Sequence, residues 1–344
     1  MAHAISPTQR IEWMYKLNAN SSHPAEWRIY SDIEIAIIEE QYQNKQPEAR
    51  LDDYHIDLIN QVQISIHNSK HQCPVKRVVN LRGDGRLREE RFMPNPILPS
   101  QPFTDARHRS SFLDAAGQYF NLTIGYDLTV LAMLVEKAAE GIIVEARKVG
   151  KEKEGQWMAA QLLKVKSGRY KDVAECCARL YCMESFLYKT LNEIMRLGMD
   201  EQHQALWRSK LPTLGPFTCL LFNLQQNLSL PTAAKTMTVY RGANFSQDLI
   251  EQYRRISALP EANRGSCQFT AFTSTSRNRE KAQQFGNVLF VIEISEADGC
   301  DVSSYSEFNE EEHLLNPHFY FFIQSCIFDD QINKWIIKLR SLNI

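Results

Sequence analysis

Apolar and polar positions in the first quarter of the chain alternate in short runs around one helical stretch. Apolar residues from Ile33 to Tyr42 follow a helical repeat, and Asp32 is placed to cap that helix. Two aromatic pairs flank a turn-prone stretch and indicate a hairpin before the helix: Trp13 with Tyr15, and Trp27 with Tyr30. Strand-like runs follow at 54–59, 62–66 and 75–81. The pattern predicts a small α+β unit.

Later in the chain the pattern changes from helical to strand-like. Helical spacing is found at 157–165, 170–180 and 186–195, where Gly198 is placed to end the last helix. Short β-branched or aromatic runs then follow at 236–240, 269–275, 288–294, 319–323 and 335–339. The run Val288–Ile292 has no polar interruption, so we expect that strand to be buried on both faces. These segments predict a strand-rich core preceded by helices.

A proline-rich stretch separates the two parts. Four prolines lie between Met93 and Pro102, and proline removes backbone donors and disfavours helix in the residue before it. We therefore expect an N-terminal unit over 8–82, a stiff linker over 83–107 and a C-terminal unit over 108–344, with its core motifs at 236–325. A length of 344 residues suits two domains.

Composition excludes several classes of protein. Lys and Arg number 39 and Asp and Glu 41, a net charge of −2, so a generally basic nucleic-acid-binding protein is excluded and no direct nucleic-acid partner is expected. The longest apolar stretch, near 128–135, is far too short for a membrane span, and the chain starts without a signal-peptide pattern. Eight scattered cysteines without a Cys-x-x-Cys pair favour reduced thiols over zinc or disulfides. We expect a protein of the cytoplasm or nucleus with no membrane contact.

Two polar motifs follow predicted strands. Arg241 comes directly after an apolar run and precedes Gly242, so its planar guanidinium could bind an anion where the backbone approaches closely. Ser274 to Ser276 place hydroxyl groups at the end of a second strand, and Ser276 could cap the next helix. Taken singly, each motif is also compatible with an ordinary solvated turn or a plain strand end.

A third motif is acidic. In an extended strand Glu310 and Glu312 would point to the same face, and repulsion between two carboxylates would raise the pKa of at least one. A solvated acidic turn is the alternative interpretation.

Taken together, the motifs resemble a known signature. Arg241, Ser274 within Ser-Thr-Ser, and Glu312 within Glu-x-Glu occur in the order found in arginine-specific mono-ADP-ribosyltransferases, and the resemblance covers roughly 155–344. The family more often has an aliphatic residue where His313 stands. The resemblance implies an α+β protein whose C-terminal unit is a split β-sandwich with a helical lead-in. It also implies transfer of ADP-ribose from NAD to protein arginine, with release of nicotinamide.

Roles follow from the matching motif positions. The resemblance implies that Glu312 binds the ribose 2′-hydroxyl and stabilises an oxocarbenium-like ribose, while Ser274 holds that ribose. Arg241 would clamp NAD, and Glu310 would orient the guanidinium of the acceptor arginine and ease loss of its proton. Further NAD contacts are expected from Gly242, Thr275 and Ser276. NAD is the only cofactor implied, as a substrate, and no metal is required.

The N-terminal unit resembles a WWE domain over 8–82. Two tryptophans and a glutamate define that family, and here Trp13, Trp27 and Glu39 match it. The resemblance implies a twisted half-barrel sheet with a helix, and binding either to ADP-ribose units of poly(ADP-ribose) or to proteins. The tryptophans are expected in the core, and ligand positions by analogy are Tyr30, Tyr54, Gln63 and Arg77.

Two other functions stay open on sequence alone. In an NAD glycohydrolase, water would replace the arginine acceptor. In a catalytically silent scaffold, the unit at 8–82 would bind ADP-ribose polymers or ADP-ribosylated proteins. The intact motifs argue against the scaffold.

Overall fold

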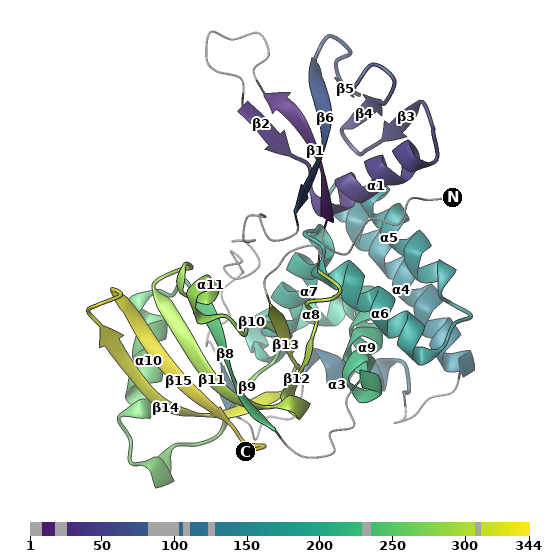
Figure 1. Cartoon of the computed structure of the whole chain (residues 1–344). Helices are drawn as coiled ribbons and strands as arrows, with labels where there is room; N and C mark the ends of the chain where they lie inside the picture. Colours follow the sequence, from purple (N-terminus) through teal and green to yellow (C-terminus); the bar gives the residue numbers. More distant parts are fainter. Residues whose placement is uncertain are drawn as a thin grey trace.

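The computed structural model describes residues 9–17, 26–81, 103–105, 111–122, 128–228, 235–306 and 311–344. Figure 1 shows a small N-terminal unit above a helical region, with a large strongly twisted sheet beside the helices. The predicted α+β class is confirmed. Glu310 lies outside the described residues, as does most of the expected linker.

The N-terminal unit is a sheet with one helix on it. Its six described strands have the order β2-β1-β6-β5-β4-β3. They are β1 (Gln9–Leu17), β2 (Glu26–Ile29), β3 (Glu48–Arg50), β4 (Tyr54–Asp57), β5 (Val62–Ser65) and β6 (Gln72–Leu81). Helix α1 (Asp32–Gln43) starts one residue earlier than predicted. Its N-cap is Ser31 and not Asp32, and Ser31 forms a capping box with Glu34. The Asp32 carboxylate instead accepts from the Glu184 backbone N–H at 2.7 Å.

A polar contact inside this unit fixes α1 to the sheet. Trp13 is 1% exposed, and its indole Nε1 donates to Glu39 Oε2 at 2.9 Å. Arg77 donates to both oxygens of the same carboxylate, at 2.9 and 2.8 Å. The expected core position is therefore right for Trp13. Trp27 is only half-buried and lies under the Lys76 ammonium, 4.2 Å from Nζ to the ring centroid.

Helices fill the middle of the chain. They are α3 (Phe112–Tyr119), α4 (Leu128–Lys148), α5 (Glu152–Lys164), α6 (Tyr170–Cys182), α7 (Phe186–Arg196), α8 (Gln204–Ser209) and α9 (Leu211–Leu228). Helices α4 and α9 cross closely at Gly141, where an added Cβ would lie 1.9 Å from the Thr213 carbonyl oxygen. A larger residue at 141 would push the two helices apart.

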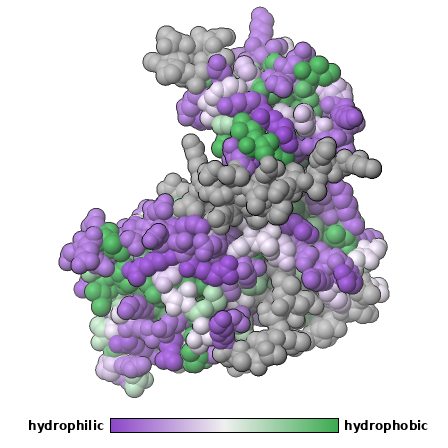
Figure 2. Space-filling model, in the orientation of Figure 1, coloured by the Kyte–Doolittle hydropathy of each residue, from purple (hydrophilic) through white to green (hydrophobic). Residues whose placement is uncertain are grey.

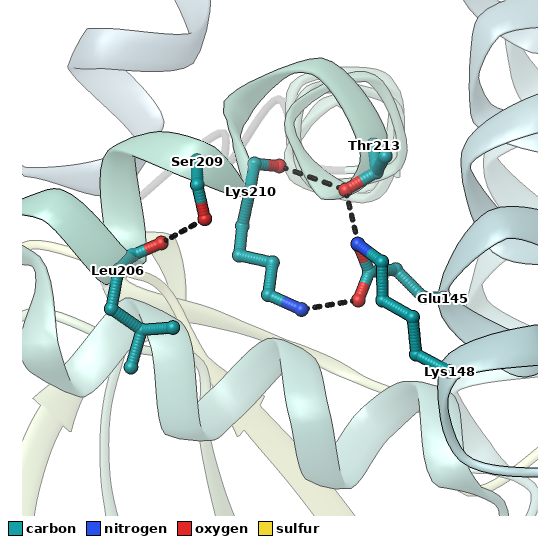
Figure 3. A network of polar contacts seen from close by, with 6 residues as sticks. All are labelled: Glu145, Lys148, Leu206, Ser209, Lys210 and Thr213. Carbon is teal, nitrogen blue, oxygen red and sulfur yellow. Dashed lines mark hydrogen bonds and ion pairs between the residues drawn. The ribbon is translucent and has the colours of Figure 1, made fainter.

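The same crossing buries a charged network (Figure 3). Glu145 is 2% exposed and accepts from Lys148 Nζ and Thr213 Oγ1, both at 2.7 Å, and from Lys210 Nζ. Burial alone would raise the pKa of Glu145, but these hydrogen bonds outweigh it and hold the pKa below its usual value. The network ties α4 to the start of α9.

The C-terminal sheet has nine described strands in the order β12-β13-β10-β8-β11-β15-β14-β9-β7. They are β7 (Thr104–Asp105), β8 (Thr236–Ala243), β9 (Cys267–Phe269), β10 (Thr273–Ser276), β11 (Val288–Ser295), β12 (Gly299–Asp301), β13 (Glu312–Leu315), β14 (Phe319–Asp329) and β15 (Lys334–Ser341). Helices α10 (Gln247–Ser257) and α11 (Arg279–Gln283) accompany them. Strand β11 lies between β8 and β15, and Val288, Leu289, Phe290 and Ile292 are buried as predicted, whereas Val291 is only half-buried.

One predicted strand, over 269–275, is divided in two. β9 pairs with β14, whereas β10 pairs with β13 and β8 on the other side of the sheet. Between them Ala271 and Phe272 leave the sheet and pack into the core of the helical region, where Phe272 lies 5.6 Å from Tyr181 between ring centroids. The strand is interrupted because these side chains are buried in the helical region, and the strand propensity of the sequence carries no information about such burial.

The N-terminal unit is docked on the helices, with α1 lying beside α5 in Figure 1. Asp52 accepts from the Lys153 backbone N–H at 2.6 Å, so it caps the start of α5 from outside. Trp157 Nε1 donates to Glu40 Oε2 at 2.7 Å. The N-terminal unit is therefore held to the helices by specific hydrogen bonds as well as by the polypeptide that connects them.

Hydrophobic side chains on the face shown in Figure 2 form small groups separated by hydrophilic ones. Across the described ranges, none of the helices is both long and apolar enough to span a bilayer. Within the same ranges, no group of three or more His, Cys, Asp or Glu side chains is arranged to hold a metal ion.

Candidate active site

Strand β10 brings the three sequence motifs together. It pairs with β13 on one side, where Ser276 lies opposite Glu312, and with β8 on the other, where Ser276 lies opposite Tyr240. Arg241 on β8 donates from Nη1 to the Ser274 carbonyl oxygen at 2.7 Å. Arg241, Ser274 and Glu312 therefore lie on three neighbouring strands, although long stretches of sequence separate them.

Glu312 is fully buried at the start of β13. Its position is fixed by the strand ladder, because its backbone carbonyl accepts from the Val302 N–H at 3.0 Å on the far side from β10. The carboxylate lies near enough to Arg241 for attraction between the two charges. The strand ladder therefore fixes the backbone from which this buried carboxylate extends.

Arg241 shares its surroundings with a second cation. Burial, with repulsion from Arg196 as a smaller cause, lowers the pKa of Arg241 to about 10, although Tyr181, Tyr253 and Glu312 offset part of the effect. The pKa of Arg196, at the end of α7, is also lowered, chiefly by burial. Guanidinium groups in such surroundings are suited to binding an anion.

Arg196 is a residue that the sequence motifs did not single out. It lies on a helix far from the strands in sequence, and an arginine at a helix end is a common and unspecific feature. No local sequence pattern distinguishes it from other helix-terminal arginines.

The hydroxyl groups of β10 have partners within the protein. Ser274 is 5% exposed, while Thr275 and Ser276 are completely buried. Thr275 Oγ1 donates to the His313 carbonyl oxygen at 2.6 Å, and Ser276 Oγ accepts from the Asn278 N–H at 3.0 Å. The expectation that Ser276 caps the next helix is wrong, because Ser276 ends a strand and the Asn278 side chain caps α11.

Gly242 allows another segment of the protein, and not only a ligand, to approach its backbone closely. A Cβ built there would lie 2.3 Å from the Ala282 carbonyl oxygen and 2.7 Å from Phe285 Cβ. The end of α11 therefore packs directly on β8, next to Arg241. A contact of Gly242 with NAD stays a prediction.

The prediction of an extended strand across 310–312 is wrong for the middle residue, Glu311. Strand β13 begins at Glu312, and Glu311 has a φ of 50°, in the left-handed region. Alternation along an extended strand therefore cannot be used to place Glu310 on the face of Glu312. The predicted role of Glu310 rests on the motif alone.

His313, the departure from the family pattern, is accommodated by a glycine. The imidazole is 4% exposed, and a Cβ on Gly299 of β12 would come within 2.6 Å of its Nε2. Burial lowers the pKa of His313 to about 4, with Asp301 raising it and Arg277 lowering it by smaller amounts. The side chain is therefore neutral at neutral pH and fills space behind Glu312.

In the N-terminal unit, three of the four predicted ligand positions lie close together. Tyr30 and Gln63 are both 4% exposed, and the Tyr30 hydroxyl donates to Gln63 Oε1. The Tyr15 ring lies 4.9 Å from that of Tyr30, and half-buried Tyr54 is near enough to influence the pKa of both tyrosines. The fourth position, Arg77, is already engaged by Glu39.

Comparison with known proteins gives a match for each unit. The family model described as NAD:arginine ADP-ribosyltransferase matches residues 136–344, and the model of the WWE domain matches 11–77. A Mycobacterium avium (strain 104) protein, Mav, named as a candidate NAD(+)–arginine ADP-ribosyltransferase, is 36% identical over 105 residues. That stretch is 29% of this chain, and the chain spans only 12% of the length of Mav.

The solved structures that the chain resembles include two bacterial proteins. Exoenzyme S of Pseudomonas aeruginosa, solved with human 14-3-3 protein beta and Carba-NAD, is 17% identical with a TM-score of 0.40, covering 61% of this chain and 89% of that one. HopU1 of Pseudomonas syringae pv. Tomato DC3000 is 19% identical with a TM-score of 0.40, covering 64% and 98%.

Proposed function

Because the chain belongs to the NAD:arginine ADP-ribosyltransferase family, whose substrate is NAD, we propose that it transfers ADP-ribose from NAD to arginine side chains of proteins and releases nicotinamide. The observation that supports this most strongly is the meeting of Arg241, Ser274 and buried Glu312 on adjacent strands. Each motif alone is ordinary, and only their juxtaposition makes a site.

The chemistry asks for a carboxylate beside the ribose. Breaking the bond between nicotinamide and ribose C1′ leaves an oxocarbenium-like sugar, and a fixed negative charge stabilises it. Glu312 supplies that charge and accepts the ribose 2′-hydroxyl proton in a hydrogen bond. Ser274 holds the ribose, and its carbonyl is in turn tied to Arg241.

The pyrophosphate of NAD has two charges to neutralise. Repulsion from Arg196 contributes to the lowered pKa of Arg241, so an anion near both guanidinium groups would relieve that repulsion and could accept hydrogen bonds from their planar donors. We assign the pyrophosphate to this pair.

The acceptor must lose a proton during the reaction. A free arginine guanidinium has a pKa above about 12 and is a poor nucleophile while charged. Glu310 would orient it and take up that proton. If water replaced arginine, the same site would be an NAD glycohydrolase.

The WWE domain gives the enzyme a second ligand site. We propose that the cluster around Tyr30 and Gln63 binds an ADP-ribose unit of poly(ADP-ribose) or of an ADP-ribosylated protein, and so recruits the enzyme to its acceptors. The half-buried rings of Tyr15 and Tyr54, and not the buried ring of Tyr30, would provide the surface for stacking on adenine, and the Gln63 amide could pair with the base edge.

The proposal is tested with NAD labelled in its adenine part and an arginine-rich polypeptide. Wild-type protein should release nicotinamide and label the polypeptide, and Glu312→Gln should lower both rates by about 100-fold or more. Glu293→Gln, an exposed glutamate on β11, is the matched control and should behave as wild type. Wild-type activity no higher than that of Glu312→Gln would refute the enzyme. Nicotinamide release without any labelled arginine would favour the glycohydrolase.

A further inference from the structure

Glu311, the middle residue of Glu-x-Glu, has an unusual backbone conformation. Its φ of 50° lies in the left-handed region, which a residue with a side chain adopts only when its surroundings hold it there. It lies immediately before the first residue of β13. The turn at Glu311 therefore sets the direction from which the chain enters the strand that contains Glu312.

Three contacts hold this turn, and all come from residues 277–281, which follow β10 and form the start of α11. Glu311 Oε1 accepts from Lys281 Nζ at 3.0 Å and from Asn278 Nδ2 at 3.1 Å. Its carbonyl oxygen accepts from the Arg277 backbone N–H at 3.1 Å. We call the contacts of Glu311 with Lys281 and Asn278 the Glu311 clamp. They also hold the pKa of Glu311 below its usual value.

The clamp and the strand ladder hold neighbouring residues by separate means. Glu312 lies opposite Ser276 in the ladder with β10, and its carbonyl is bonded to Val302. None of those bonds uses the Glu311 side chain. Cutting the clamp should therefore leave Glu312 in place and release the side chain of Glu311.

We propose that Glu311 is a positioning residue, whose clamp fixes the chain before Glu312 and so sets how efficiently arginine, rather than water, receives the ADP-ribose. This inference rests on the proposed function. Glu310 is joined to Glu311 by one peptide bond, so rotation at Glu311 changes where that carboxylate points. Arginine must be aligned for attack, and small misplacements are costly, whereas water needs far less orientation.

The experiment measures two products from one reaction: nicotinamide released, and ADP-ribose attached to an arginine-rich polypeptide. Glu311→Ala and Lys281→Met should each lower the ratio of attached ADP-ribose to released nicotinamide by about five- to tenfold, as expected for losing one charge-assisted hydrogen bond at a half-exposed site. The KM for NAD should change less than about twofold, because Arg241 and Glu312 keep their contacts.

A double variant and a matched control separate the clamp from a general loss of stability. Glu311→Ala combined with Lys281→Met should be no worse than the poorer single variant, because both remove one interaction. Glu311→Gln keeps an oxygen acceptor and should recover part of the ratio. Glu251→Ala breaks a comparable half-exposed ion pair with Arg254, 2.8 Å long on α10, and should leave the ratio unchanged.

An unchanged ratio in Glu311→Ala would overturn the inference while leaving the proposed function intact, provided that the wild type labels arginine. An equal fall in Glu251→Ala, or a parallel fall of both products with a raised KM, would overturn it as well. A wild type that releases nicotinamide but labels no arginine would refute the proposed function and the acceptor-side role together.

Discussion

Replacing Arg241 by lysine keeps a positive charge and removes the planar fork. The guanidinium uses Nη1 for the Ser274 carbonyl at 2.7 Å, which leaves its other donors for the pyrophosphate. A lysine has its three donors on one nitrogen, so it cannot reach two partners that the spread, planar guanidinium reaches from separate nitrogens. Losing one charge-assisted hydrogen bond costs about 1.5–3 kcal/mol, or roughly 10- to 150-fold in binding. We expect the KM for NAD to rise by that factor, with a smaller fall in kcat.

The surroundings of Arg241 add a pH signature to this variant. Burial and Arg196 lower the pKa of Arg241 to about 10, so the wild type stays charged below that pH. The same surroundings would lower the pKa of a lysine from a value that is already lower. Activity of Arg241→Lys should therefore decline as the pH rises through that pKa, before the wild type declines.

Steady-state nicotinamide release measured against NAD concentration and pH is the assay for Arg241→Lys. The control is Arg264→Lys, because Arg264 also donates to a backbone carbonyl, that of Gln324 at 2.8 Å, but outside the site. A KM in Arg241→Lys equal to that of the control, with the same pH profile as the wild type, would refute the assignment of Arg241 to NAD.

Two further predictions concern the rest of the molecule. Glu145→Ala leaves Lys210, 15% exposed, without its buried partner and should lower the free energy of unfolding by about 3–5 kcal/mol, measured by denaturant titration, whereas exposed Glu140→Ala should have little effect. Gln63→Ala should weaken binding of ADP-ribose fragments to the full chain in calorimetry, and Gln43→Ala, which alters only the Glu39 contact, should not. Equal affinity in both glutamine variants would contradict the ligand site.

Local sequence patterns predicted the strands and the motifs, but they did not predict the turn at Glu311 just before β13. Arg241, Ser274 and Glu312 were found because each follows or begins an apolar run, and neighbouring strands then bring such residues together. The left-handed Glu311 could not be predicted, because glutamate has no turn preference and long-range contacts with Lys281 impose its conformation.

Two long helices also escaped prediction, for a related reason. α9 contains Gly215 and Pro216, which usually interrupt helices, and its buried residues surround it instead of forming one stripe. Gly215 faces Ala116 of α3, and Gly141 of α4 faces Thr213. These residues serve helix contacts that form only in the folded chain, so amphipathic spacing gives no sign of them.

The WWE domain is docked through polar contacts between residues far apart in sequence, and local sequence patterns could not predict these contacts either. Asp52 caps α5, whose own N-cap residue makes no side-chain cap bond. The buried cluster that begins at Trp13 continues through the helices to Phe272 and Leu314, next to the site on β10 and β13. Because one continuous core joins the ligand cluster of the WWE domain to the catalytic sheet, movement between the two would have to break apolar packing as well as polar bonds. A linker alone would not impose that cost, so the WWE domain is held against the helices, and the recruitment that we propose would act through a set geometry.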